Sequence, residues 1–213
     1  MDGPDISAEE QTANDAGVIA CWSCKGPVSR VTAFCETCGA VQPPGQADHF
    51  FRLGLERSFD VDVESLDQHY FDMQRHLHPD RFATRSAQEK SLSQQQATAI
   101  NDAYETLKEP LKRADYLVHL LGVDVLPEGC NMVNDQVLLM ETMEMREALA
   151  QAETPEQVSV FSDRAQADIK QCVEQLSTLF KDDDIEGACK LTTRLKYLTK
   201  LAEETRIHQM KLI

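Results

Sequence analysis

Residues 74–82 read Gln-Arg-His-Leu-His-Pro-Asp-Arg-Phe and lie between two helical patterns. Apolar residues before this stretch recur at spacings of four, three and four, as on one face of an α-helix; they are Leu66, Tyr70, Met73 and Leu77. Pro79 ends that helix, because proline lacks the backbone N–H that a helix needs. A second helix is predicted over about residues 86–108, stopped by Pro110. The stretch is therefore predicted to be the loop of a helical hairpin.

The tripeptide His78-Pro79-Asp80 is the chemically distinctive part of this loop. Proline stiffens the loop, so the histidine and aspartate side chains are presented outward. Arg75 and Arg81 flank them and form a locally basic surface in an acidic chain. A docking site and a capped turn with merely solvated charges are both compatible with this pattern.

From Asp48 onward the chain is helical in pattern. Asp48 is a plausible N-cap for a short helix around Phe50 and Phe51, and Asp62 or Asp60 for the helix before the loop. Further helices are predicted over about 111–121, 134–152, 155–181 and 184–211. Short connections between the last three favour an antiparallel three-helix bundle, so the fold class is mainly all-α.

Two C-x-x-C pairs lie near the N-terminus, separated by ten residues, and their four cysteines are Cys21, Cys24, Cys35 and Cys38. Two such loops can place four sulfurs around one metal ion, with Gly26 and Gly39 relieving the turns. A segment of residues 20–42 with so few apolar side chains cannot fold on core burial alone, which favours one structural zinc in a zinc-ribbon-like fold. Iron in a rubredoxin-like site has the same sulfur geometry and remains open.

The segment following these cysteines, Pro43-Pro44-Gly45-Gln46, is expected to be a short stiff linker between two separate cores. The other three cysteines are scattered and are expected to be ordinary buried thiols; they are Cys130, Cys172 and Cys189.

Composition excludes several classes of function. The formal net charge of −15 makes binding to nucleic acid or anionic membranes unfavourable, and no apolar run is long enough to span a membrane. No nucleophile–base pair or phosphate loop is present, so we expect no enzyme. Asp182-Asp183-Asp184 could attract a cation, but acids at a helix start are more often a cap.

The acidic first residues contain neither the apolar core of a secretory signal nor the arginines of a transit peptide, and residues 1–19 are expected to be a disordered tail. We therefore expect a cytoplasmic protein, or a mitochondrial matrix protein if a transit peptide has been removed.

The first helix of the predicted bundle has apolar residues on two faces. Its inward stripe on a helical wheel is Leu138, Thr142, Met145, Leu149 and Ala152. Leu139, Met140 and Met143 lie about 100° or more from Leu138, and acids accompany them at Glu144 and Glu147. Exposed leucine and methionine rimmed by acids are typical of a partner surface, although contact with the hairpin or a neighbouring helix is the alternative.

The hairpin resembles a J-domain over about residues 48–117. Besides His-Pro-Asp, the resemblance rests on Ile100-Asn-Asp-Ala-Tyr-Glu-Thr-Leu107 followed by Arg113. J-domains dock on DnaK-type chaperones and stimulate their ATP hydrolysis. The resemblance implies that the functional triad is His78, Pro79 and Asp80, with Arg75 and Arg81 as docking charges.

A J-domain followed by a connecting segment (118–133) and a short acidic bundle (134–213) resembles the HscB/Jac family of iron–sulfur cluster co-chaperones. The two C-x-x-C loops resemble the zinc-bearing version of that family in animal mitochondria. The resemblance implies two partners, a DnaK/HscA-type chaperone and an IscU-type scaffold protein, and a monomer or weak homodimer. It also implies the scaffold-binding residues Leu139, Met140, Met143, Glu144, Glu147 and Tyr197, with Gln151 where an acid is usual.

Two other functions remain open from the sequence. One is an iron-binding protein for electron transfer or metal delivery, with the helices as its scaffold. The other is a general J-protein that serves unfolded clients.

Overall fold

The computed structural model describes residues 17–122 and 136–212, without the side chain of Val137. The predicted acidic tail therefore lies mostly outside the described residues, as does most of the connecting segment 118–133. The first strand begins at Val18, within the range expected to be disordered, because it pairs with a second strand nine residues later.

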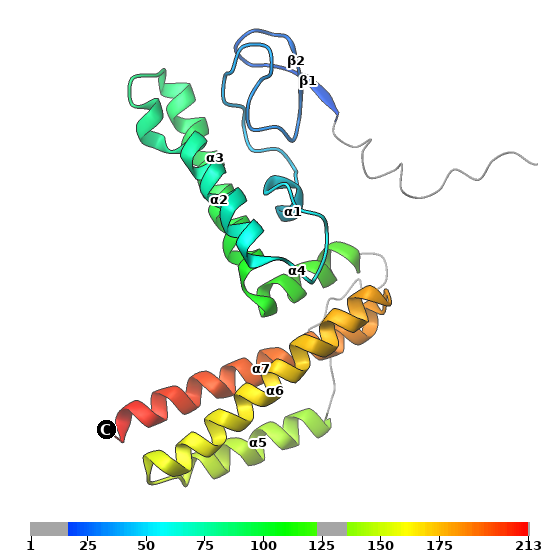
Figure 1. Cartoon of the computed structure of the whole chain (residues 1–213), viewed down its shortest axis with the longest axis vertical. Helices are drawn as coiled ribbons and strands as arrows, with labels where there is room; N and C mark the ends of the chain where they lie inside the picture. The colour runs from blue at the N-terminus through cyan, green and yellow to red at the C-terminus, as the bar shows by residue number, and fades with distance from the viewer. Residues whose placement is uncertain (1–16, 123–135, 213) are drawn as a thin grey trace, which may run out of the picture. The chain divides into compact units, whose positions relative to one another are not determined.

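The chain divides into two compact units (Figure 1). The first contains residues up to Arg57 together with Asp62–Leu107, and the second contains Ser58–Val61 together with the chain from Lys108 onward. The elements of the first unit are β1 (Val18–Ala20), β2 (Pro27–Ser29), α1 (His49–Arg52), α2 (Val63–Leu77), the 3-10 helix η2 (Pro79–Phe82) and α3 (Ala87–Lys108). Those of the second are α4 (Pro110–Leu121), α5 (Gln136–Ala150), α6 (Pro155–Lys181) and α7 (Ile185–Lys211). The mainly helical class with a small N-terminal β-hairpin is confirmed.

Local capping explains where several helices begin. The carboxylates of Asp48 and Asp62 accept backbone N–H groups from Phe51 and Ser65 at 2.8 and 3.1 Å, so Asp62 and not Asp60 caps α2. Thr154 and Gln157 form a reciprocal capping box at the start of α6. Asp184 caps α7, which agrees with the cap interpretation of the three consecutive aspartates.

The core of the first unit is formed where α2 packs on α3. Leu66, Leu77 and Ile100 are fully buried. The rings of Tyr70 and Tyr104 stack with centroids 3.9 Å apart, which joins the middle of the two helices. The hairpin is therefore held by its own apolar contacts.

The junction after the cysteines differs from the predicted linker. The side-chain N–H of buried Gln96 on α3 donates to the Gln42 carbonyl at 2.9 Å. A Cβ on Gly45 would lie 1.9 Å from the Arg30 carbonyl oxygen, so only glycine allows this close approach. The cysteine segment and the hairpin consequently share one compact unit, although the cysteine segment also has a small core of its own around Val28.

The second unit contains the three-helix bundle, in which α5, α6 and α7 lie side by side (Figure 1). Arg146 on α5 donates two hydrogen bonds to the Glu204 carboxylate on α7, at 2.8 and 3.0 Å. Arg194 on α7 lies 3.3 Å from Glu141 on α5. The later residue on α5 pairs with the later residue on α7, so these two helices run parallel. The intervening helix α6 runs antiparallel to both.

Residues 58–61 also belong to the second unit, although they precede α2 in sequence. Buried Phe59 stacks on Phe180 of α6 with ring centroids 5.2 Å apart, and the Arg113 guanidinium lies 5.1 Å from the Phe59 ring centroid. The domain boundaries predicted from sequence stay a prediction.

Cys172 is a buried free thiol, as expected. Cys189 is buried but disulfide-bonded, so the expectation of a free thiol is wrong there, and Cys130 lies outside the described residues. None of the described helices has the length and apolar character needed to cross a membrane.

Candidate metal centre and interaction surfaces

Two similar turns carry the four cysteines. In the first, the Cys21 N–H donates to the Gly26 carbonyl at 2.8 Å, and in the second the Cys35 N–H donates to the Ala40 carbonyl at 2.9 Å. Each turn requires a left-handed residue directly after its second cysteine: Lys25, with φ of 64°, and Gly39, with φ of 72°. Gly26 is therefore not the residue with the special backbone conformation in the first turn.

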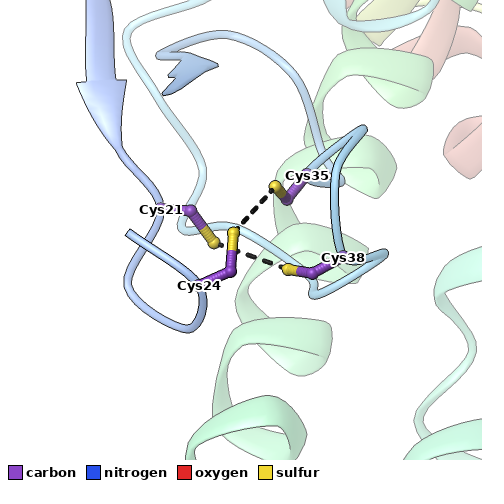
Figure 2. A group of neighbouring side chains, drawn as sticks. All are labelled: Cys21, Cys24, Cys35 and Cys38. Atoms are coloured by element: carbon purple, nitrogen blue, oxygen red, sulfur yellow. Dashed lines mark hydrogen bonds between the residues drawn. The ribbon is translucent and has the colours of Figure 1, made fainter. Parts of the chain in front are cut away.

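The four sulfurs converge on one point (Figure 2). Cys21 Sγ lies 3.8 Å from Cys38 Sγ, and Cys24 Sγ lies 3.8 Å from Cys35 Sγ. All four ligand atoms lie within 4.8 Å of one another. A tetrahedron with metal–sulfur bonds of ~2.3 Å has edges of ~3.8 Å, so this arrangement fits a single four-thiolate ion such as zinc.

Hydrogen bonds to sulfur favour ionised thiols in this cluster. Backbone N–H groups of Ser23 and Gly26 donate to the sulfurs of Cys21 and Cys24 at 3.4 Å each. Burial opposes ionisation of Cys21, but backbone N–H groups and the neighbouring thiols outweigh it and lower its pKa to about 6.

The thiols also oppose one another's ionisation. The Gly26 N–H lowers the pKa of Cys24, yet the Cys38 sulfur, burial and the other two sulfurs together raise it to about 11. Four thiolates at this spacing repel one another, and a bound dication removes that conflict. The chemistry of the donor set therefore suits a metal ion.

Gln42 supports the cluster and has no signal in the sequence that would single it out. Its side-chain N–H donates to Cys21 Sγ at 3.3 Å and to the Ala40 carbonyl at 2.8 Å. Its backbone carbonyl accepts from Gln96, so one residue connects the cysteine cluster to α3. Trp22 adds a second support, because its indole N–H donates to the Val41 carbonyl at 2.7 Å.

The His-Pro-Asp corner is a short rigid turn with exposed side chains. His78 ends α2, and its Nδ1 accepts the Asp80 backbone N–H at 3.3 Å. The side chains of His78 and Asp80 are 55% and 90% exposed, whereas Phe82, directly after the corner, is buried. The serine hydroxyl of Ser93 on α3 donates to the Leu77 carbonyl at 2.7 Å and fixes the end of α2. The backbone of the corner is thus fixed by α3 and by a buried phenylalanine, while the side chains of His78 and Asp80 are exposed.

The two flanking arginines lie on the same corner. An Arg81 guanidinium N–H donates to the Arg75 carbonyl at 3.0 Å. The Arg75 guanidinium itself lies 3.2 Å from the Asp72 carboxylate in an exposed ion pair, which is weak at a surface. The structure therefore brings His78, Asp80, Arg75 and Arg81 together.

The outer face of α5 is apolar and exposed within the second unit. Leu139, Met140 and Met143 are 42%, 63% and 61% exposed, while Leu138, Thr142, Leu149 and Ala152 of the predicted inward stripe are buried. Glu144 and Glu147 are exposed as well. Among the described residues of this unit, none covers the three apolar side chains completely, which favours a partner surface over packing inside the bundle.

Tyr197 lies on α7 and is half-buried. It falls on the same helical stripe as Arg194 and Glu204, the two α7 residues that pair with α5. The ring therefore belongs to the side of α7 that faces α5.

Comparison with known proteins places these features in a wider context. Residues 134–206 match the family described as "HSCB C-terminal oligomerisation domain". The human "Iron-sulfur cluster co-chaperone protein HscB" is 35% identical over 211 residues, covering 97% of this chain and 89% of the human protein. A "Co-chaperone protein HscB homolog" of Aliivibrio fischeri is 35% identical over 170 residues, covering 78% of this chain and 99% of that protein.

Comparison with solved structures leads to the same family. The crystal structure of human co-chaperone protein HscB matches with a TM-score of 0.82 and 35% identity, covering 90% of this chain and 99% of the human chain. The similarity thus extends over nearly the whole described chain and includes both units.

Proposed function

This chain belongs to the HscB family of iron–sulfur cluster co-chaperones, and on that premise we propose that it acts as a non-enzymatic adaptor. Its first unit stimulates ATP hydrolysis by a DnaK/HscA-type chaperone. Its second unit binds an IscU-type scaffold protein and delivers it to that chaperone for cluster transfer. The observation that carries the proposal is the exposed His-Pro-Asp corner in a chain related to these co-chaperones over most of its length.

The chaperone contact is formed by the corner. Pro79 and the anchoring of Leu77 and Phe82 hold His78 and Asp80 in one orientation, so binding costs little conformational entropy. Arg75 and Arg81 add positive charge, which favours approach to an acidic docking surface. These five residues are the proposed chaperone-binding set: Arg75, His78, Pro79, Asp80 and Arg81.

The scaffold contact is formed by the outer face of α5. Leu139, Met140 and Met143 supply adaptable apolar surface, and methionine fits irregular partner surfaces. Glu144 and Glu147 supply charge on α5, and Tyr197 supplies an aromatic ring from α7. Gln151 is exposed on the same helix end and offers no charge, so it contributes less than an acid would.

The metal of the cysteine centre is one zinc ion with a structural role, held by Cys21, Cys24, Cys35 and Cys38. A closed four-thiolate site has no open position for water, so it supports folding and not hydrolysis. The protein is a monomer or a weak homodimer in this proposal.

The test is a steady-state ATPase assay with the chaperone and scaffold protein of the same organism. We expect the full chain to raise the chaperone's hydrolysis rate several-fold and to hydrolyse no ATP alone. Absence of stimulation would overturn the proposal. If the chain instead suppresses aggregation of denatured proteins in general, it is a general J-protein and not a dedicated adaptor.

A further inference from the structure

A cleft of about 550 Å³ lies within the first unit, between the cysteine segment and the corner that follows His-Pro-Asp. One wall is the turn that contains Cys38 and Gly39, with Ser23 beside it. The opposite wall comes from the end of α2, from η2 and from the turn before α3. The lining side chains that matter for the argument are Ser23, His76, Arg81, Arg85 and Glu89.

The helical wall of the cleft is basic. His76, Arg81 and Arg85 are all exposed, in a chain with a net charge of −15. Within the described residues Arg85 forms no ion pair, and Arg81 uses one N–H on the Arg75 carbonyl, which leaves further donors. A guanidinium binds carboxylates in a bidentate manner, so two of them favour an acidic ligand.

The acidic side chain in this wall, Glu89, offsets only part of the charge of the two guanidinium groups. Glu89 accepts hydrogen bonds from the Ser86 N–H and hydroxyl at 3.1 and 2.9 Å, where it caps the first turn of α3. The cleft thus presents three basic groups against one carboxylate that is already hydrogen-bonded.

The position of the cysteine wall depends on the metal centre. The Gly39 N–H donates to the Cys35 carbonyl at 2.8 Å, and Cys35 and Cys38 are both ligands of the centre. The helical wall has its own core, through Leu77 and Phe82. Loss of the metal would therefore release one wall and leave the other in place.

We propose that this cleft receives an acidic segment of the partner chaperone, so that the metal-held turn forms part of the chaperone-docking surface. The proposal rests on the proposed function, because it takes the chaperone as the partner. Its arguments are charge complementarity and continuity, since Arg81 both lines the cleft and directly follows Asp80.

The first variants change the helical wall in the full-length, zinc-loaded protein. Arg85→Glu should raise the concentration that gives half-maximal ATPase stimulation about tenfold, with the maximal rate retained. Lys90→Glu is the matched control, because this exposed lysine is close in sequence, makes the same charge change and does not line the cleft. It should stay within about twofold of the wild type.

The decisive variants change the cysteine wall without touching a metal ligand. Ser23→Glu should weaken docking about tenfold and Ser23→Arg should strengthen it, each with one metal ion retained per chain. Ala20→Glu, exposed and outside the cleft, is the control.

The outcomes separate the two proposals. If the wild type stimulates but both Ser23 variants stay within twofold of it, the cysteine wall takes no part and the cleft proposal is wrong. If Ser23→Glu lowers affinity for the scaffold protein and not for the chaperone, the cleft does not receive the chaperone and the proposal is wrong. If the wild type itself gives no stimulation, the proposed function fails first.

Discussion

The Ser177 hydroxyl donates to the Asp60 carboxylate at 2.7 Å, although 117 positions separate the two residues in sequence. Lys181 Nζ lies 2.6 Å from the same carboxylate oxygen. Asp60 and Phe59 together attach the short segment between α1 and α2 to the end of α6. We expect Asp60 and Phe59 to contribute very different amounts to the free energy of unfolding, and both contributions can be measured.

The Asp60 contact should stabilise the fold weakly and in a pH-dependent way. The hydrogen bond from Lys181 and then that from Ser177 lower the pKa of Asp60 below its ordinary value of 3.8. The stabilisation is thus complete above pH 3.8 and is lost as pH falls through the lower, folded-state pKa. Because the pair is half-exposed, Asp60→Asn should cost less than about 1 kcal/mol at pH 7.

Urea unfolding at pH 7 and near pH 3 checks this contact. The difference in free energy of unfolding between Asp60→Asn and the wild type should become smaller at the lower pH. Asp163→Asn, at an exposed position of α6, should have the same free energy of unfolding as the wild type at either pH. An undiminished difference for Asp60→Asn at low pH would contradict the assigned contact.

Phe59 should contribute far more to the free energy of unfolding than Asp60 does. It is 3% exposed, stacked on Phe180 and covered by Arg113. Phe59→Ala removes a buried ring and leaves a cavity, so it should lower the free energy of unfolding by about 3–5 kcal/mol. Phe51→Ala is the control, because that ring is 55% exposed. Equal losses in the two variants, measured by urea unfolding, would show that Phe59 is not a core residue.

The metal centre should contain one zinc per chain. Metal analysis of the purified protein decides between the metals, and colour gives a first indication, because a ferric four-thiolate site is red and a zinc site is colourless. Stoichiometric iron after growth with ample zinc would support the electron-transfer or metal-delivery alternative.

Removal of the metal by Cys35→Ser should unfold the cysteine segment and also weaken its contact with α3. The Gln42 carbonyl loses its fixed position opposite Gln96, and a buried amide without its partner costs about 1–3 kcal/mol. Helical circular dichroism should be nearly retained at 25 °C, with a lower Tm. An unchanged Tm would mean that the segment and the hairpin are uncoupled.

The His-Pro-Asp corner should be required for stimulation of the chaperone's ATPase and should contribute little to the free energy of unfolding. Asp80→Asn and His78→Gln should abolish stimulation of the chaperone's ATPase, while the free energy of unfolding changes by about 0.5 kcal/mol or less, because both side chains are exposed. The measurements are the ATPase rate at saturating protein and urea unfolding. Wild-type stimulation by either folded variant would exclude the corner as the required element.

The outer face of α5 should carry scaffold binding. Leu139→Ala with Met143→Ala removes two exposed apolar side chains, so affinity for the scaffold protein should fall at least tenfold by titration calorimetry. The matched control is Val160→Ala with Met210→Ala, which are 66% and 59% exposed on α6 and α7. Intrinsic stimulation of the chaperone should survive in both. Unchanged affinity in the folded α5 variant would move the binding face elsewhere.

The features that could be predicted from sequence are those with local causes. The bounds of α6 and α7 agree within a residue or so because Thr154 and Asp184 cap them from their own first turns. The inward stripe of α5 follows from helical periodicity alone. The four cysteines could be grouped because two short turns each bring two thiols together.

The features that could not be predicted have partners far away in the chain. Nothing near Gln42 indicates Gln96, 54 positions later, so the shared unit of cysteine segment and hairpin was missed. The segment around Gly45 is predicted only as a short stiff linker, whereas the missing Cβ of this glycine allows close packing against the Arg30 carbonyl. The left-handed Lys25 was also missed, because only glycine announces such a conformation in a sequence.

The docking of residues 58–61 onto α6 also fixes an order of events on the ribosome. Ser177 is translated 117 positions after Asp60, which at ~5–20 residues per second takes about 6 to 23 s. During that interval the hairpin of α2 and α3 can close, since its core is made of earlier residues, but Phe59 has no ring to stack on. The nascent chain therefore lacks the stacking partner of this phenylalanine until the end of α6 has been translated.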